Sequence, residues 1–447
     1  MPENSSVLPT PDHRLSDWLR RDLAPGLLVL VAMLLFAPRL EVPRRYMFDE
    51  VYHAYTAGQY VAGNADAYVW NTKPPRAGVS YMWNHPPVGV LMIAGGILLW
   101  GDEPFGWRFS SAVFGAVGIL LVYLMGIATT RDRRIALLAA GLVLVDTLWF
   151  VQSRIGMLEI FATVFSLATL LSLYGFLTSP PERAIRTLIL TGLFLGLALA
   201  TKWNAAFLWV LTAPLVLYRS STLVRRASDT PRATPSLGLR CAAIWVPISL
   251  LIIPAVIYLA AYIPFFATGH DWEQFLELKR QTFAYHTQLK EAHTYQSRWW
   301  QWPFAMRPIW YSVTYTGDTV AHVYANGNAL LYWAFIPAVM WLCLRYWRES
   351  NPALPILLIG FFGQWLPWAF SPRNAFMYYF LPAVPFGAIA VASAVTASYR
   401  RGGAWRAIGL VYLTALVAYF VFFYPIHAGL PISREAFEAR IWFSSWR

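Results

Sequence analysis

The stretch VGVLMIAGGILLW at residues 88–100, directly after Asn84-His85-Pro86-Pro87, decides how the chain is arranged. It is apolar, but it is shorter than the roughly 20 residues that a helix needs to cross a bilayer. If it does not cross, the arginine-rich loops all fall on one side of the membrane, as the positive-inside rule requires. If it crosses, every later loop changes side and the rule is broken. We therefore predict a juxtamembrane or partly inserted helix here.

The composition of the whole chain indicates a polytopic membrane protein. Of its 447 residues, 57% are hydrophobic and 13% are charged, and the mean hydropathy is +0.45. Soluble domains carry about 25% charged residues, so a soluble globular protein and a disordered one are both excluded. The net charge of +12 comes mostly from arginines in short loops between apolar runs. It therefore indicates membrane topology rather than nucleic-acid binding.

The remaining apolar runs predict an all-α membrane protein with about eleven transmembrane helices, its N-terminus inside and its C-terminus outside. They lie near residues 23–39, 106–128, 135–152, 158–178, 186–201, 203–218, 241–266, 328–346, 353–371, 375–397 and 404–425. Two long segments, 40–105 and 267–327, then face outward. Both mix aromatic residues, His, Pro and charges, so we expect them to be ordered and to carry juxtamembrane helices.

This arrangement divides the chain into four parts. Residues 1–22 form a cytoplasmic tail, and 23–266 form an N-terminal catalytic transmembrane module that includes the outer loop 40–105. Residues 267–327 form a second outer loop. Residues 328–447 form a C-terminal module of four spans with an outward tail.

Two adjacent carboxylates, Asp49 and Glu50, follow the first predicted span. Acidic residues favour helix N-termini, so a solvated helix cap would explain them. A functional pair at the outer rim of the membrane explains them equally well, and the residues alone leave both readings open.

Charged residues also stand at the predicted outer ends of several spans: Arg108, Arg154, Glu159, Lys202 and Arg373. Snorkelling to the interface would explain a single one. Because all five lie on the same side as the acidic pair, we expect an anionic ligand there. Arginine can hold a phosphate through two hydrogen bonds.

Histidines and aromatic residues mark the outer segments. His85 precedes a Pro pair, which would hold it in a fixed place. His286 and His293 are seven residues apart and share a helix face. No third ligand is spaced for a metal and no HExxH motif occurs, so we expect no metal site. Trp310 and its aromatic neighbours would form either an interfacial belt or the floor of a sugar or lipid site.

Seven motifs, in order along the chain, resemble the protein O-mannosyltransferase family. They are Phe48-Asp49-Glu50-Val51-Tyr52-His53; His85-Pro86-Pro87-Val88-Gly89; Trp107-Arg108-Phe109-Ser110-Ser111-Ala112; Ser153-Arg154-Ile155-Gly156-Met157-Leu158-Glu159; Gly196-Leu197-Ala198-Leu199-Ala200-Thr201-Lys202-Trp203; the stretch from Tyr285-His286 to Tyr311; and Pro372-Arg373 with Tyr378-Tyr379-Phe380-Leu381-Pro382. Glu159 departs from the aspartate of many members, which leaves its role open. The chain resembles compact prokaryotic members, without the luminal β-trefoil domain of fungal and animal ones.

The resemblance implies an integral-membrane transferase of the GT-C fold. It would move mannose from polyprenyl-phosphate mannose to Ser or Thr hydroxyls of secreted or membrane proteins, with inversion at the anomeric carbon. An inverting transfer needs a base at the acceptor hydroxyl. Asp49 is the predicted base, and Glu50 would orient the acceptor or the sugar. The leaving phosphate needs positive charge rather than an acid, and the candidates are Arg108, Arg154, Lys202, Arg307 and Arg373. The residues expected to line the substrate pocket are His85, Glu159, His286, His293 and Trp310.

The resemblance also implies no cofactor and no catalytic metal. The expected partners are the lipid donor, a Ser/Thr-containing acceptor protein or peptide, and the bilayer; a translocon or a second copy of the chain is a further option, and nucleic acid is not expected. The lipid tail of the donor would lie in a groove between spans. The active site would face the outside of a bacterial plasma membrane.

Two other hypotheses stay open. A sibling GT-C enzyme would glycosylate a lipid or glycan, as an aminoarabinose transferase acting on lipid A does, and Lys73-Pro74-Pro75 is faintly similar to that branch. The stretch 293–311 favours the protein mannosyltransferase. An anion transporter is disfavoured, because transporters often have repeated halves with binding near the midplane. The chain also lacks a Walker A loop, a Rossmann glycine fingerprint and a Gly-x-Ser-x-Gly elbow.

Overall fold

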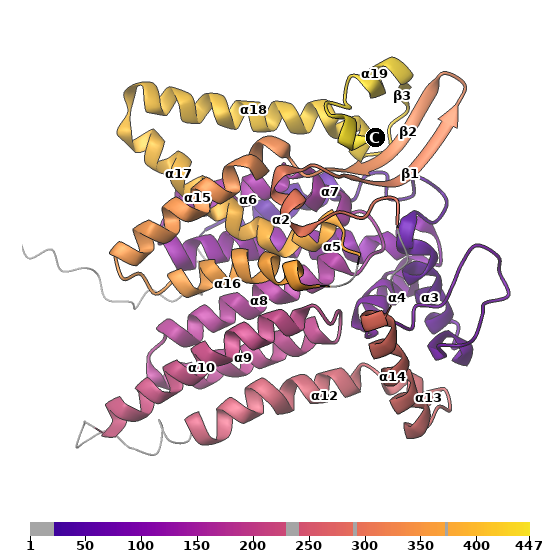
Figure 1. The fold of residues 1–447 in the computed structure, drawn as a ribbon, viewed down its shortest axis with the longest axis horizontal. Helices are drawn as coiled ribbons and strands as arrows, with labels where there is room; N and C mark the ends of the chain where they lie inside the picture. Colours follow the sequence, from indigo (N-terminus) through magenta and orange to yellow (C-terminus); the bar gives the residue numbers. More distant parts are fainter. Residues whose placement is uncertain (1–21, 229–240, 289–292, 372–373) are drawn as a thin grey trace, which may run out of the picture.

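The computed structural model describes residues 22–228, 241–288, 293–371 and 374–447 (Figure 1). Within these ranges the chain is mostly helical, as predicted, and its long helices run side by side along one direction.

The N-terminal half supplies most of the bundle. Its helices are α2 (Ala24–Phe36), α3 (His53–Val61), α4 (Val88–Trp100), α5 (Pro104–Thr130), α6 (Arg133–Leu144), α7 (Thr147–Gln152), α8 (Glu159–Thr178), α9 (Pro181–Leu199) and α10 (Ala205–Ser228), with the 3₁₀ turns η1 (Phe48–Val51) and η2 (Ala65–Tyr68). The π-helical turns η3 (Cys241–Trp245) and η4 (Ile248–Ile252) lead into α12 (Ile253–Ala260), followed by α13 (Ile263–Ala267) and α14 (Trp272–Gln288).

The C-terminal part adds further helices and the strands. In order these are η5 (Trp299–Phe304), β1 (Ile309–Thr316), β2 (Thr319–Ala325), α15 (Ala329–Arg348), α16 (Leu354–Trp365), η6 (Leu366–Phe370), η7 (Met377–Ala383), α17 (Val384–Arg401), α18 (Gly403–His427), β3 (Ile432–Ser433), α19 (Arg434–Glu438) and η8 (Ser444–Trp446).

Ordinary capping chemistry sets several helix boundaries. Pro104 and Pro181 take the first positions of α5 and α9, where the missing N–H has no intrahelical partner to lose. Asp146 accepts a 2.8 Å hydrogen bond from the backbone N–H of Trp149 and so caps α7.

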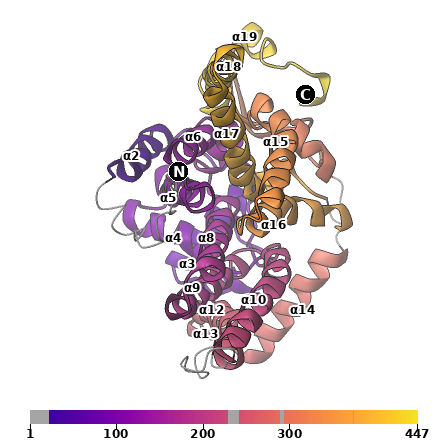
Figure 2. The same cartoon turned by 90° about the vertical axis from the view of Figure 1, so that its left-hand side faces the viewer.

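Helix α8 lies at the centre of the bundle, between α5, α9 and α10 (Figure 2). Of its 20 residues, 15 are buried. Close packing here depends on small residues: a Cβ on Gly118 of α5 would lie 2.4 Å from the Trp149 ring and 3.1 Å from Val164 of α8. The first turn of α8 is thereby held in a fixed place, and it carries Glu159.

Contacts between helix ends show which ends meet. The Tyr346 hydroxyl, near the end of α15, donates to the Thr129 carbonyl at the end of α5 (3.2 Å). Arg400, at the end of α17, forms an ion pair with Asp132 just before α6. The elements of the two predicted outer segments, including α3, α4, α14 and the β1–β2 hairpin, lie together at the opposite end, which we call the site end (Figure 1).

The β1–β2 hairpin was not predicted. Its two strands pair in antiparallel fashion around Gly317-Asp318, and β3 adds to the other edge of β2. The strand sequences IWYSVTYT and TVAHVYA are rich in β-branched and aromatic residues, which fit a pleated surface. Gly317 has φ +56°, a conformation that glycine adopts without strain.

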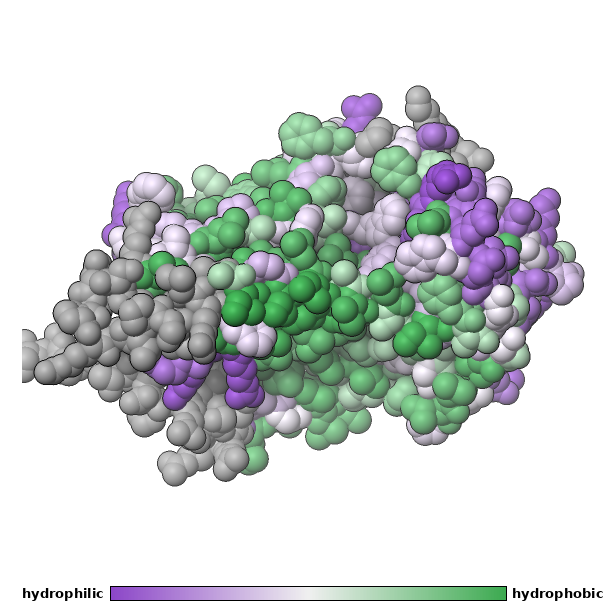
Figure 3. All heavy atoms as spheres, turned by 90° about the horizontal axis from the view of Figure 1, so that it is seen from below, coloured by the Kyte–Doolittle hydropathy of each residue, from purple (hydrophilic) through white to green (hydrophobic). Residues whose placement is uncertain are grey.

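Within the described residues, seven helical stretches are long and apolar enough to cross a membrane: 104–130, 159–178, 205–224, 243–267, 329–348, 377–401 and 403–427. Three further apolar helical stretches are shorter, at 24–36, 88–100 and 354–370. Figure 3 shows apolar side chains across the middle of one long face and hydrophilic side chains at the site end. The number of eleven spans stays a prediction.

Candidate active site

A cavity of about 350 Å³ lies at the site end of the bundle. Its wall comes from segments far apart in the sequence: η1 and the start of α3, the stretch 80–85, the start of α8, the α9–α10 connection, the end of α14, and residues 374–379. Five of the predicted site residues line it, namely Asp49, His85, Glu159, Lys202 and His293.

Asp49 lies in η1 and is partly exposed in the cavity. Burial raises the pKa of Asp49 to about 7; the nearby Glu159 carboxylate also raises it, and Lys202 opposes them. Among the residues that the structure describes, none donates a hydrogen bond to the Asp49 carboxylate. A carboxylate with these properties is suited to accept a proton near neutral pH.

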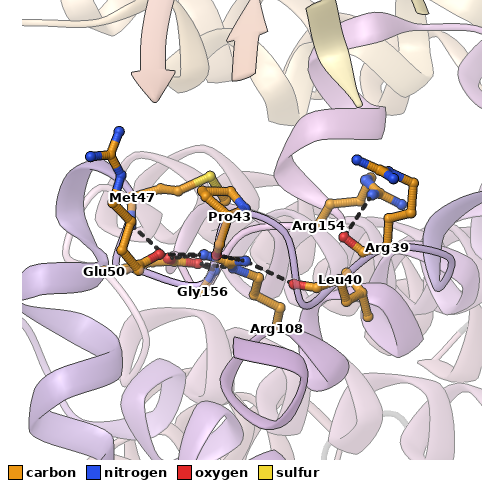
Figure 4. A network of polar contacts seen from close by, with 9 residues as sticks. Arg39, Leu40, Pro43, Met47, Glu50, Arg108, Arg154 and Gly156 are labelled. Carbon is orange, nitrogen blue, oxygen red and sulfur yellow. Dashed lines mark hydrogen bonds and ion pairs between the residues drawn. The ribbon is translucent and has the colours of Figure 1, made fainter. Parts of the chain in front are cut away.

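Glu50, the next residue, is fully buried and does not line the cavity; Figure 4 shows its carboxylate facing Arg108. Arg108 Nε and Nη2 donate to its two carboxylate oxygens at 2.7 Å each. The backbone N–H groups of Met47 (2.8 Å) and Gly156 (2.9 Å) donate to the same oxygens. Two charge-assisted and two backbone hydrogen bonds therefore hold Glu50 in one position.

Arg108 has no N–H left for a ligand. Its Nη1 donates to the carbonyls of Leu40 (2.8 Å) and Pro43 (3.0 Å), and Nη2 also donates to the carbonyl of Arg45 (2.9 Å). Together with the pair to Glu50, these bonds use all five donors of the guanidinium. Arg108 thus ties the segment after α2 to α5, instead of facing the cavity as a phosphate ligand would.

Arg154 also turns toward the backbone. Its Nη1 donates to the carbonyls of Phe36 and Pro38 at 2.6 Å each, and Figure 4 shows its guanidinium reaching the Arg39 carbonyl. These carbonyls lie at and just after the end of α2, where the last C=O groups have no intrahelical partner. Arg154 therefore caps the C-terminus of this helix. Arg154 is not among the residues that line the cavity.

Lys202 and Glu159 form an ion pair in the cavity wall, with exposed fractions of 7% and 5%. Burial alone disfavours the charged ammonium and is the largest single effect, but Glu159, Tyr379 and Asp49 together outweigh it and raise the pKa of Lys202. The Lys202 Nζ also lies 4.7 Å from the centre of the Tyr379 ring and 5.5 Å from that of Tyr378. Lys202 therefore stays positively charged and is held by an anion and two aromatic faces.

Aromatic rings form another part of the wall. Phe48 has φ +47°, unusual for a residue with a side chain, and its ring contacts those of His293, Tyr311, Phe376 and Tyr378 at centroid distances of 5.2–6.5 Å. The ring cluster holds the strained residue directly before Asp49.

Three other predicted residues, His286, Arg307 and Trp310, lie elsewhere. His286 Nε2 is 2.6 Å from the Asn84 carbonyl, next to the cavity. Arg307 donates to the carbonyls of Thr294, Ser445 and Arg447, and the Trp310 indole donates to the Trp446 carbonyl. Arg307 and Trp310 thus hold the C-terminal tail and do not line the cavity. Arg373 lies outside the described residues.

Three of the cavity residues that the sequence analysis did not select as site residues matter for the chemistry: His53, Tyr378 and Tyr379. His53 stands four residues after Asp49, the spacing of one helical turn, so its position was open to prediction. The two tyrosines belong to a quoted motif, but nothing in the sequence shows that their rings cover Lys202.

A second feature lies beside the cavity. An apolar groove of about 580 Å³ runs between α9, α10 and α12 and is lined by Leu199, Trp203, Ala206, Trp209, Leu250, Leu251, Pro254, Ala255 and Tyr258. Trp203 follows Lys202 directly, and its ring lies 5.4 Å from that of His286. The groove therefore starts next to the charged wall of the cavity.

Within the described part of the chain, no three His, Cys, Asp or Glu side chains are grouped so that they could hold a metal ion.

Comparisons with known proteins fit this geometry. A family model described as "Dolichyl-phosphate-mannose-protein mannosyltransferase" matches residues 26–269, and one described as the "C-terminal four TMM region of protein-O-mannosyltransferase" matches residues 271–446. The polyprenol-phosphate-mannose–protein mannosyltransferase of Mycobacterium tuberculosis is 27% identical, over 99% of this chain and 95% of that protein. The Corynebacterium glutamicum protein of the same name is also 27% identical, over 81% of each.

Solved structures share the fold. The protein O-mannosyltransferase Pmt1–Pmt2 complex of Saccharomyces cerevisiae, bound to the sugar donor, superposes with a TM-score of 0.78 at 16% identity, over 95% of this chain and 92% of that one. ArnT of Cupriavidus metallidurans, bound to undecaprenyl phosphate, gives a TM-score of 0.54 at 15% identity, over 91% and 71%.

The helical bundle, with its charged cavity at one end and the apolar groove beside it, defines the class as a membrane glycosyltransferase of the GT-C fold. The chain belongs to the dolichyl-phosphate-mannose-protein mannosyltransferase family.

Proposed function

We propose that this protein transfers mannose from polyprenyl-phosphate mannose to Ser or Thr hydroxyls of acceptor proteins, and that Asp49 and Lys202 carry the chemistry. The observation behind the assignment is that one cavity holds a carboxylate with a pKa of about 7 and a buried, charged lysine. A transferase that inverts its sugar needs both, a base for the acceptor and a positive charge for the leaving phosphate.

Asp49 is the proposed base. Its carboxylate accepts the proton of the acceptor hydroxyl as the hydroxyl oxygen attacks the anomeric carbon. The bond from that carbon to the phosphate oxygen breaks on the opposite side, and the configuration inverts. The electron pair of the broken bond stays with the polyprenyl phosphate, so no protein acid is needed.

Lys202 is the proposed phosphate ligand. The charge of the leaving phosphate increases as the bond breaks, and an ammonium fixed in a buried wall stabilises that charge without reorganising. Glu159 and the Tyr379 ring hold the ammonium there. Arg108 and Arg154 are positioning residues in this proposal, because their N–H groups bind backbone carbonyls and Glu50.

The apolar groove is the proposed place for the polyprenyl tail. It is lined by Leu, Trp, Ala, Pro and Tyr side chains. One of them, Trp203, directly follows Lys202, the proposed phosphate ligand. The head group would then enter the cavity while the tail stays in the bilayer. In this proposal the site end faces the outside of the plasma membrane, where secreted acceptors are found.

The test is transfer of radiolabelled mannose from polyprenyl-phosphate mannose to Ser/Thr peptides by the purified protein. Transfer by the wild type and its loss in Asp49→Asn are the expected results. Transfer only to a lipid or glycan acceptor would place the protein in the alternative class, GT-C enzymes that glycosylate lipids or glycans. Transfer that survives Asp49→Asn would remove Asp49 as the base.

A further inference from the structure

His53 is an unusual residue in the cavity wall. It is the first residue of α3, four positions after Asp49, and only 6% of it is exposed. Neither ring nitrogen makes a hydrogen bond with any described residue, and Nδ1 is fully buried. The great majority of buried polar groups in proteins are hydrogen-bonded, because an unpaired one costs stability.

The surroundings of His53 keep its ring neutral. Burial lowers the pKa of His53 to about 3, and the charge of Lys202 acts in the same direction. A neutral imidazole has one N–H donor and one nitrogen acceptor. It therefore matches a hydroxyl group, which both donates and accepts.

A second unpaired polar atom lies in the same wall. Glu159 Oε1 binds Lys202, whereas Glu159 Oε2 is buried and has no partner among the described residues. The wall thus offers a carboxylate acceptor as well as the imidazole, both close to the positive charge of Lys202. Two neighbouring hydroxyl groups on one ligand would satisfy both residues.

We infer that His53, together with Glu159, recognises hydroxyl groups of the donor sugar and so determines which sugar is transferred. The inference rests on the proposed function. It assigns these residues to the sugar and not to the acceptor because the sugar is bonded directly to the phosphate, whose proposed ligand is Lys202. The acceptor approaches Asp49 from the face opposite the breaking bond.

The variant His53→Phe tests this inference, since it keeps a ring of similar size and removes both nitrogens. His322→Phe is the matched control: His322 is also buried, its two ring nitrogens have no hydrogen-bond partner in the described part of the chain, and it packs on Phe437 outside the cavity. Binding is measured to polyprenyl-phosphate mannose and to polyprenyl phosphate without the sugar. Transfer is measured with mannosyl donors that each lack one hydroxyl.

We expect His53→Phe to weaken binding of the mannosyl lipid about tenfold and to leave binding of the bare lipid phosphate unchanged, the size expected for a lost buried hydrogen bond. Relative to the wild type, His53→Phe should transfer mannose from the complete donor about tenfold more slowly. With the one deoxy donor that lacks the contacted hydroxyl, the two proteins should transfer the sugar equally fast. His322→Phe should leave the preference between the two lipids unchanged. If His53→Phe does not fold, His53→Gln, which keeps a donor and an acceptor, should retain preference for the mannosyl lipid.

Two results would overturn the inference: an equal loss with every deoxy donor, or a His53→Phe protein that prefers the mannosyl lipid as strongly as the wild type does. Failure of the proposed function looks different. In that case the wild type itself transfers no mannose to peptides, and it binds the mannosyl lipid no better than the bare phosphate.

Discussion

Arg108 Nε and Nη2 each donate a 2.7 Å hydrogen bond to one oxygen of Glu50, and both side chains are fully buried. The pair lies one residue from Asp49, so it fixes the turn that presents Asp49 to the cavity. Its role in this arrangement is to position the proposed base.

Glu50→Gln should therefore destabilise the protein strongly. The variant leaves the buried charge of Arg108 without its counter-ion, and breaking one side of such a pair costs about 3–5 kcal/mol of unfolding free energy. Thermal unfolding of the purified protein measures the loss, with the exposed Glu41→Gln as control. A melting temperature equal to that of the wild type would contradict this account of the pair.

Asp49→Asn should abolish transfer and preserve stability. Removal of a general base typically lowers kcat by about 10²–10⁴. No described residue donates to the Asp49 carboxylate, so the amide loses no hydrogen bond. Mannosyl transfer and thermal unfolding are measured together, with the exposed Asp66→Asn as control. A large drop in melting temperature would show that Asp49 is structural.

The pH dependence should follow Asp49. Burial raises its pKa to about 7, and the base acts only when deprotonated, so transfer should increase as the pH rises through about 7. A rate that is constant from pH 5 to 8 would exclude Asp49 as the titrating base.

The same pKa predicts a slope in stability. The unfolded carboxyl has a pKa near about 4, so between about pH 4 and 7 the folded chain binds more protons than the unfolded one. The contribution of Asp49 to stability therefore falls as the pH rises through this window. Asp49→Asn should remove that slope, which melting temperatures of both proteins across the window would show.

Lys202→Met should weaken the donor site. It removes the charge proposed to bind the phosphate, and charge-assisted contacts of this kind are worth about 1.5–3 kcal/mol, or roughly 10- to 150-fold in kcat/KM. Lys202→Arg should recover part of the activity, because it keeps the charge. The exposed Lys73→Met is the control. Unchanged transfer by Lys202→Met would move the phosphate site to another cation.

Trp446→Ala should affect stability but not catalysis. Trp446 is fully buried, and its indole donates a 2.7 Å hydrogen bond to the Ala305 carbonyl, away from the cavity. Truncation of a buried Trp costs about 3–5 kcal/mol. The folded variant should keep its kcat, whereas Trp405→Ala, at an exposed position, should change neither quantity. A lower kcat in folded Trp446→Ala would connect the tail with the site.

The sequence predicts the helical architecture and several cavity residues for clear physical reasons. The length of an apolar run identifies a helix, and the charge of each loop shows on which side of the membrane the helix ends lie. Asp49, Glu159 and Lys202 were therefore all expected at one end of the bundle. Depth along a helix does not give the direction of a side chain, however. Arg108 lies near the start of α5 and Arg154 just before α8, but both bind backbone carbonyls at or after the end of α2.

Long-range docking explains the other differences. Arg307 and Trp310 bind carbonyls of residues 445–447, contacts that no local pattern encodes. The hairpin β1–β2 is a short element between membrane helices, where helix length and hydropathy give no signal. The spacing of Asp49 and His53, by contrast, was visible in the sequence.

The ring of Phe48 belongs to the first of the two family regions, and the rings of Tyr311, Phe376 and Tyr378 that it contacts belong to the second. The wall of the cavity is consequently shared across the boundary between the regions. A chimera that joins residues 26–269 of this chain to the second region of a distant relative would have to preserve these contacts between aromatic rings. Modular exchange within the family is limited there, even though the boundary itself falls in a connecting segment.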